Sequence, residues 1–260
     1  MAYGGYGGGS GGSRPRRRFQ PDQRTLIIVI VAVALIAILL RTHRISSANI
    51  IYFCVLIPSI ILHEVSHGVV ARAFGDDTAA RAGRLTLNPF VHVDPVGTLI
   101  VPALLALGGF GVFGWAKPVP VNNARLRSPR NQGVLVALAG PMTNAVLAGL
   151  GALLFIATFR DTVLRTGVLS LPAEIVFYFS LGNIGLMAFN LVPIPPLDGS
   201  VLFERLLPRR YWPTYLRIRP YTMMIVVGLV LLNFLFNPGP ITIAFQHLYN
   251  WWSGVLFGGG

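Results

Sequence analysis

Charged residues are scarce in this chain of 260 residues: they make up 12% of it, and only nine are aspartate or glutamate. A soluble domain carries about 25% charged residues, so this composition argues against a soluble globular protein. Hydrophobic residues account for 53% of the chain and gather into long runs, which is typical of a polytopic membrane protein. The net charge of +12 comes from arginines between these runs, and it therefore indicates membrane topology rather than nucleic-acid binding.

The chain has one cysteine, Cys54, so an intrachain disulfide framework is excluded. Cys54 lies within an apolar run, and we expect it to be a small packing residue. A clear small-residue cleavage site of a secretory signal peptide is also missing. Residues 1–24 are instead rich in glycine and arginine, and we expect them to form a disordered cytosolic tail before a membrane anchor.

Apolar runs long enough to cross a bilayer recur along the chain. We expect five transmembrane spans, at residues 25–41, 48–74, 133–159, 172–195 and 221–236. A sixth apolar stretch, 95–114, contains glycines and prolines, so it either crosses the membrane or dips in and returns. The predicted fold is an all-α polytopic membrane protein with five to six transmembrane helices and a re-entrant or β-hairpin-like segment around 95–122. The integral membrane domain would occupy 25–236, followed by an aromatic-rich interfacial segment at 237–260.

Basic residues orient this arrangement, because cytosolic loops of membrane proteins carry an excess of lysine and arginine. With the N-terminus inside and 95–114 re-entrant, 17 of the 21 basic residues fall on the inner side. The sequence thus predicts a multi-pass protein of the cell membrane with a cytosolic N-terminus. A full crossing by 95–114 would invert every later segment.

Residues 63–67 (HEVSH) place two histidines and a glutamate inside the second apolar run. Ionisable side chains at membrane depth are costly, so they are candidates for function by default. On a helix, His63 and His67 share one face, and the H-E-x-x-H spacing provides two zinc ligands with Glu64 beside them as general base. Helix rise puts His63 about 21 Å below the outer end of its helix. In a hydrocarbon core about 30 Å thick, this depth lies towards the cytosolic face.

A catalytic zinc usually takes a third protein ligand and leaves one position open. Asp198 is the candidate, because acidic residues are few and it follows the proline-rich residues 190–197 (NLVPIPPL). Prolines exclude an ordinary helix there, and irregular backbone at membrane depth needs protein or a water-filled cavity around it. The alternative is an ordinary turn or helix-capping aspartate. Asp198 reaches the side of the histidines only if 95–114 does not cross, which is the arrangement that the basic residues also favour.

These motifs occur in an order that resembles the site-2 protease family of intramembrane zinc metalloproteases (peptidase family M50), without its PDZ insertion. The resemblance covers a catalytic core of about 48–205. Besides the two segments above, it is carried by residues 88–98 (NPFVHVDPVGT), 114–122 (GWAKPVPVN) and 140–144 (GPMTN). It implies one Zn²⁺ per chain, with His63, His67 and Asp198 as ligands and Glu64 as catalytic base.

The resemblance implies an intramembrane zinc metalloendopeptidase that hydrolyses peptide bonds in or near transmembrane segments of membrane proteins, as in regulated intramembrane proteolysis. Glu64 would activate a zinc-bound water. The resemblance places Asn190 near the scissile carbonyl and Asn144 along the same cavity, where either could support the oxyanion. We expect the β-prone residues 112–122 to form an edge strand that pairs with the substrate. The expected partners are transmembrane protein substrates and membrane lipids, and the sequence specifies no oligomeric state.

Several polar residues keep a second interpretation. His92 and Asp94 either orient a zinc ligand from behind it or cap the apolar stretch that follows them. Asn144 and Asn190 either serve the reaction or form interhelical hydrogen bonds, whereas Asn183 is expected to be structural.

A second function also fits the histidine and aspartate cluster: a divalent-metal transporter would use such residues along its pathway. Glu64 distinguishes the two functions, because a transporter would use it as a further ligand and a protease would use it as a base.

Overall fold

The computed structural model describes residues 47–94, 97, 116–222, 224, 228, 232 and 240–258. Among these residues the chain is helical, without a strand. The longest helices are α2 (Ser47–Ala73), α5 (Pro129–Thr158) and α7 (Leu171–Asn190). Each of the three is long and apolar enough to cross a membrane. The described residues therefore contain three candidate spans.

These helices correspond to the expected spans 48–74, 133–159 and 172–195. The third helix ends at Asn190, earlier than expected, because Pro193 lacks an N–H and disfavours helical backbone at the residue before it. The expected tail 1–24, the span 25–41, nearly all of 95–114 and most of 221–236 lie outside the described residues.

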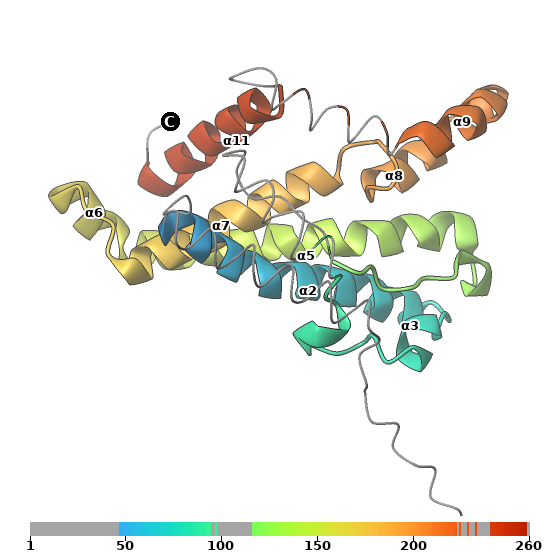
Figure 1. Cartoon of the computed structure of the whole chain (residues 1–260), viewed down its shortest axis with the longest axis horizontal. Helices are drawn as coiled ribbons and strands as arrows, with labels where there is room; N and C mark the ends of the chain where they lie inside the picture. Colours follow the sequence, from blue (N-terminus) through green and yellow to red (C-terminus); the bar gives the residue numbers. More distant parts are fainter. Residues whose placement is uncertain are drawn as a thin grey trace, which may run out of the picture.

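The three long helices pack against one another as a bundle (Figure 1). The backbone N–H of Arg127 donates to the carbonyl of Phe74 at 3.2 Å, so α5 begins at the end of the bundle where α2 finishes. The connection between α2 and α5 therefore leaves and re-enters the bundle at the same end. α7 runs back towards this end and brings Asp198 to it.

The apolar core lies where α5 and α7 meet α11 (Pro240–Phe257). Phe155 and Leu256 are fully buried there, beside Phe177. The indole N–H of Trp252 donates to the Ser180 hydroxyl at 3.0 Å, so α11 is held to α7 by a polar contact as well. Figure 1 shows α11 lying along α7, on the side of α7 away from α2.

Short helices lie near the two ends of the bundle (Figure 1). Towards the end where α2 finishes, Figure 1 shows α3 (Thr78–Arg81), α8 (Gly199–Leu206) and α9 (Trp212–Ile218). The connections between the described helices also contain the three-residue helices η1 (Pro89–Val91), η3 (Asn123–Arg125), η4 (Arg209–Tyr211) and η5 (Arg219–Tyr221). At the opposite end, α6 (Arg160–Thr166) connects α5 to α7.

The expected edge strand at 112–122 is not present in its described part, residues 116–122. Pro118 and Pro120 offer no N–H, so alternate donors of a β-ladder are missing. The segment is instead held by two neighbouring loops. Lys117 N–H donates to the carbonyl of His92 at 2.8 Å, and Asn122 N–H donates to Asp76 Oδ2 at 2.6 Å.

Candidate metal centre

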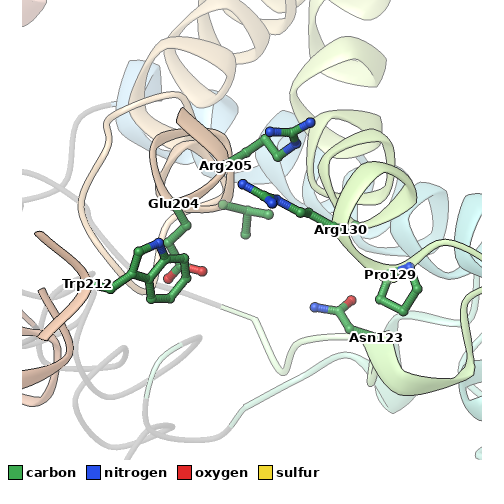
Figure 2. Close-up of a pocket in the computed structure, with 8 residues that line it drawn as sticks. Asn123, Pro129, Arg130, Glu204, Arg205 and Trp212 are labelled. Carbon is green, nitrogen blue, oxygen red and sulfur yellow. The ribbon is translucent and has the colours of Figure 1, made fainter. Parts of the chain in front are cut away.

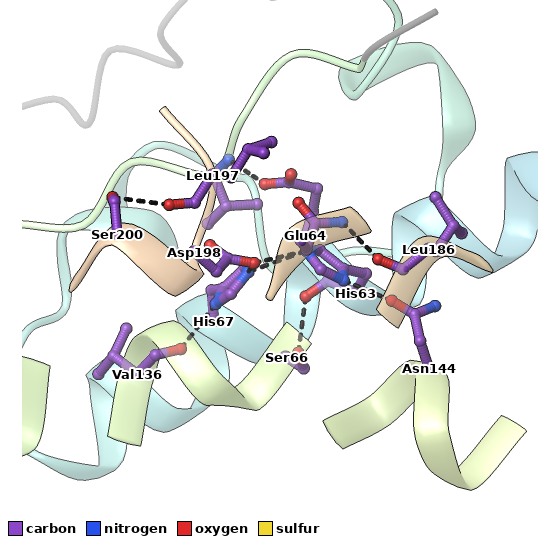
Figure 3. Close-up of polar contacts among 12 residues, drawn as sticks. His63, Glu64, Ser66, His67, Val136, Asn144, Leu186, Leu197, Asp198 and Ser200 are labelled. Carbon is purple, nitrogen blue, oxygen red and sulfur yellow. Dashed lines mark hydrogen bonds and ion pairs between the residues drawn. The ribbon is translucent and has the colours of Figure 1, made fainter. Parts of the chain in front are cut away.

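The two histidines of the H-E-x-x-H motif meet Asp198 inside the bundle (Figure 3). His63 Nε2 lies 3.1 Å from His67 Nε2 and 3.1 Å from Asp198 Oδ2. His67 Nε2 lies 3.3 Å from the same carboxylate oxygen. The histidine residues are 6% and 8% exposed and the Asp198 side chain is 21% exposed, so the histidines are buried and the carboxylate is partly open to solvent. The structure thus brings together the three residues that the sequence nominated as ligands.

The far side of each imidazole is held by a hydrogen bond to α5. His67 Nδ1 lies 2.6 Å from the carbonyl of Val136, which can only accept, so Nδ1 carries the proton and Nε2 presents a lone pair. His63 Nδ1 lies 2.6 Å from Asn144 Oδ1 and is protonated for the same reason. Partners of this kind fix the orientation of metal-binding histidines.

Three electron pairs therefore converge on one point. The buried Asp198 Oδ2 has no hydrogen-bond partner, and the two Nε2 atoms carry no proton to give it. Three acceptors in close contact repel one another unless a cation lies between them. Ligands of a tetrahedral zinc, each at about 2.0–2.1 Å, lie roughly 3.3 Å apart. The observed separations fit this arrangement, and the three residues leave one coordination position for a water or a substrate.

Two glycines allow His63, His67 and Asp198 to come this close together. A Cβ on Gly140 of α5 would lie 2.5 Å from Nε2 of His63 and would also collide with Nε2 of His67. A Cβ on Gly199 would overlap the carbonyl of Leu191, so the residue after Asp198 must be small for the 191–198 loop to close. The absence of a side chain at position 140 leaves the metal position open.

Glu64 lies beside the cluster without joining it. Its Oε2 accepts a hydrogen bond of 2.8 Å from the backbone N–H of Val119. Glu64 is half-buried, and it is absent from the group of residues whose ligand atoms converge. Glu64 therefore lies next to the candidate ligands without being one of them.

The two asparagines of the predicted site differ in their surroundings. Asn144 is fully buried and contacts His63 from behind, on the side away from Asp198. Asn190 donates through Nδ2 to the carbonyl of Leu186 at 3.0 Å, one turn back on its own helix. The geometry thus gives Asn144 an orienting contact, while oxyanion support by either asparagine stays a prediction.

His92 and Asp94 lie outside the metal cluster. His92 is 1% exposed and donates through Nε2 to the carbonyl of Thr86 at 2.9 Å. Asp94 Oδ1 accepts from the backbone N–H of Gly97 at 2.8 Å, as a capping residue does. A role for these two residues behind a zinc ligand stays a prediction.

Asp76 ties the 116–122 segment to the end of α2. Burial alone would raise the pKa of this carboxyl, but hydrogen bonds from Thr78 and Asn122 outweigh burial and lower the pKa below its ordinary value of 3.8. Asp76 is therefore ionised at neutral pH and holds the segment that reaches Glu64.

A separate hollow of about 690 Å³ lies at the start of α5 (Figure 2). It is lined by Asn123, Pro129, Arg130, Gly133, Val201, Glu204, Arg205 and Trp212. Glu204 also binds the hydroxyl of Tyr215, and burial together with this carboxylate raises the pKa of Tyr215 to about 12. None of the three clustered metal-ligand candidates lines the hollow, so it is distinct from the metal centre.

Sequence reasoning missed several residues that shape the centre: Val119, Val136, Gly140 and Asn183. Val119 and Val136 act through backbone atoms, which leave no trace in residue type. Gly140 stood within the GPMTN segment, where a glycine beside a proline in a membrane helix was the available signal. Asn183 was visible as a polar residue in an apolar run, and it hydrogen-bonds to Asn144.

Comparison with known proteins shows which family the chain resembles. The model of peptidase family M50 matches residues 51–171. YwhC of Bacillus subtilis (strain 168), named as a candidate zinc metalloprotease, is 43% identical over 154 residues, which are 59% of this chain and 67% of YwhC. Rip2 of Mycolicibacterium smegmatis, named in the same way, is 36% identical over 152 residues, 56% of this chain and 53% of Rip2.

A third relative, the zinc metalloprotease MJ0392 of Methanocaldococcus jannaschii, is 23% identical over 187 residues, which are 72% of this chain and 42% of MJ0392. No solved structure matches the chain. The family match contains the H-E-x-x-H motif and Asn144 and ends before Asp198. The placement of Asp198 as third ligand therefore rests on the distances within the cluster.

Proposed function

Because this chain belongs to peptidase family M50 and is a metalloprotease, we propose that it hydrolyses peptide bonds in or near transmembrane segments of membrane proteins. The observation that carries this proposal is the position of the metal centre. His63 and His67 lie within α2, a helix long and apolar enough to cross a membrane. A substrate must come to this depth to be cut, and a transmembrane segment is already there.

The residues present fit one zinc ion, held by His63, His67 and Asp198. When bound, zinc would supply Lewis acidity towards the substrate carbonyl and lower the pKa of water at its open position. The protein's own contribution is to keep both Nε2 lone pairs and the Asp198 carboxylate aimed at one point. Val136 and Asn144 maintain this aim by holding the opposite ring nitrogens.

Glu64 would act as the general base of the reaction. Its carboxylate would accept a proton from the attacking water and deliver it to the nitrogen of the departing amine. The hydrogen bond from Val119 N–H occupies Oε2, so this bond fixes the rotamer of the carboxylate. Burial of the two histidines limits their contact with bulk water, which strengthens the electrostatic interactions within the cluster.

We propose that the protein is a multi-pass protein of the cell membrane and that its active site lies near the cytosolic face. Two observations support this orientation. Basic residues concentrate on the loops that share an end with the metal centre, and the α2–α5 connection returns to the end that it left. The partners proposed are single-span membrane proteins within the surrounding lipid.

The test is cleavage of a tagged single-span reporter by purified protein in detergent or nanodiscs. Wild type should cut within the membrane segment, as located by mass spectrometry, and Glu64→Gln should retain zinc without cutting. Glu174→Gln makes the same chemical change on α7 at the other end of the bundle and should leave activity intact. Cleavage only of soluble peptides would contradict the proposed substrate class.

The same experiment distinguishes a metal transporter. A transporter that used Glu64 as a ligand would lose metal binding in Glu64→Gln. The structure disfavours this outcome, since the ligand atoms that converge belong to His63, His67 and Asp198.

A further inference from the structure

A line of buried hydrogen bonds runs from the back of His63 through all three long helices. His63 Nδ1 contacts Asn144 Oδ1 at 2.6 Å, and Asn144 Nδ2 donates to Asn183 Oδ1 at 2.8 Å. Asn183 Nδ2 then donates to the Ser59 hydroxyl oxygen at 2.9 Å. Asn144, Asn183 and Ser59 are each 0% exposed. Four polar side chains at membrane depth thus satisfy one another.

The direction of this line is set at Asn183. Its Nδ2 also donates to the carbonyl of Phe179 at 2.8 Å. A carbonyl can only accept, so the NH₂ group of Asn183 must face Phe179 and its oxygen must face Asn144. Asn144 must then present its own NH₂ group to Asn183 and its oxygen to His63. His63 is left with Nδ1 as the donor and an unprotonated Nε2.

We propose that Asn183 is a positioning residue for the metal centre, which fixes the proton of His63 on Nδ1 through the amide of Asn144. With Asn183 removed, Asn144 is free to turn and aim its NH₂ group at His63. Nδ1 would then be the acceptor, and the proton would move to Nε2. A proton on Nε2 stands where the metal binds, so zinc affinity falls.

Ser59 has a smaller part in this arrangement. Its hydroxyl donates to the carbonyl of Val55 at 2.9 Å, so its oxygen accepts from Asn183. The carbonyl of Phe179 already orients Asn183 without it. Ser59 satisfies the second N–H of Asn183 and is not needed for the direction of the line.

The alternative is that Asn183 only forms hydrogen bonds between helices and does not affect the metal centre. Ser180 offers the comparison, because it is also on α7, 0% exposed and hydrogen-bonded to α5, through the carbonyl of Ala148 at 2.8 Å. It has no hydrogen bond to Asn144 or His63 among the described residues. Loss of Ser180 therefore reports the cost of missing interhelical hydrogen bonds, to Ala148 of α5 and from Trp252 of α11, without a link to His63.

The proposal rests on the zinc site of the proposed function, and it is tested by zinc binding rather than by proteolysis. Purified variants are titrated with zinc against a competing chelator. Asn183→Ala should bind zinc about 10- to 100-fold more weakly than wild type, the usual effect of losing a residue behind a metal ligand. Ser180→Ala should bind zinc as wild type does. Failure of the reporter to be cleaved would leave these affinities, and the proposal, untouched.

A rescue variant provides a second test of the proposal. In the double variant Asn144→Asp with Asn183→Ala, a carboxylate faces His63 and accepts from Nδ1–H in either orientation, as in carboxylate–histidine–zinc triads. Zinc affinity should recover at least tenfold relative to Asn183→Ala, and the Nδ1-bound proton of His63 should reappear in ¹⁵N-edited NMR spectra. If only the double variant folds and binds zinc, the proposal is also supported.

Three outcomes would overturn the proposal. The first is wild-type zinc affinity in Asn183→Ala. The second is an equal loss in Ser180→Ala and Asn183→Ala. The third is failure of the rescue by Asn144→Asp, whether the double variant folds without recovering zinc or does not fold, since Asn183 would then serve packing alone.

Discussion

The backbone N–H of Val119 donates to Glu64 Oε2 at 2.8 Å, across 55 positions of sequence. Val119 lies between two prolines, so neither adjacent residue could supply this donor. The sequence Pro-Val-Pro thus presents one N–H to the carboxylate that we assign as general base. A loop residue whose side chain is chemically inert contributes to the site through its backbone.

Val119→Pro removes this N–H and tests its contribution. A hydrogen bond to a charged acceptor contributes about 1.5–3 kcal/mol, so kcat should fall roughly 10- to 100-fold. Zinc content should stay at the wild-type level, because the hydrogen bond of Val119 goes to Glu64 and not to a zinc ligand. Val119→Ala keeps the N–H and is the matched control for reporter cleavage assays. Equal rates in the two variants would show that the N–H does not orient Glu64.

Gly140→Ala should abolish zinc binding. The added methyl would lie 2.5 Å from His63 Nε2, within the space that the metal and its ligands require. We expect zinc affinity to fall by at least about 100-fold, beyond the effect of losing a residue behind a ligand. Gly149→Ala is the control on the same helix, since a Cβ there meets nothing within 4 Å. Competition with a chelator measures both, and retention of zinc by Gly140→Ala would contradict the observed geometry.

The Asp76 carboxylate should make stability depend on acid pH. Burial raises its pKa, but hydrogen bonds from Thr78 and Asn122 outweigh burial and bring the pKa below 3.8. Such a group stabilises the fold above its unfolded pKa, and this contribution is lost as pH falls through the folded value. Asp76→Asn should be less stable than wild type at neutral pH by about 1–3 kcal/mol, with the difference shrinking below pH 3.8.

Thermal unfolding in detergent between neutral and acid pH would measure this difference. Asp77→Asn is the control, because Asp77 is half-exposed and pairs with Arg81 and Arg125 at the surface. A surface pair of this kind contributes about 0–1 kcal/mol. A difference between wild type and Asp76→Asn that is independent of pH would show that ionised Asp76 does not hold the segment.

Helices and ligands were predictable from the sequence because each follows from residue type and spacing. Apolar runs located α2, α5 and α7, although the predicted span 172–195 continued past Asn190, where α7 ends. His63, His67 and Asp198 were identifiable because ionisable groups at membrane depth have few other reasons to exist. The shared end of α2 and Asp198 was predicted on the condition that 95–114 does not cross.

Other features depend on contacts that residue types do not encode. Residues 116–122 have the β-prone composition of a strand, yet they are held by His92, Glu64 and Asp76 and form no ladder. Asn183 resembles an ordinary helix-packing asparagine in the sequence, and its link to His63 emerges only from two hydrogen bonds in series, with a third to Phe179 that orients its amide. Tertiary contacts decide both cases.

The central claim is that His63, His67 and Asp198 hold one zinc ion while Glu64 does not. Its most direct measurement is the zinc content of purified wild type, Asp198→Ala and Glu64→Gln after dialysis against a weak chelator. We predict about one zinc per chain in wild type and Glu64→Gln, and little in Asp198→Ala. Full retention of zinc by Asp198→Ala, or its loss from Glu64→Gln, would contradict the account.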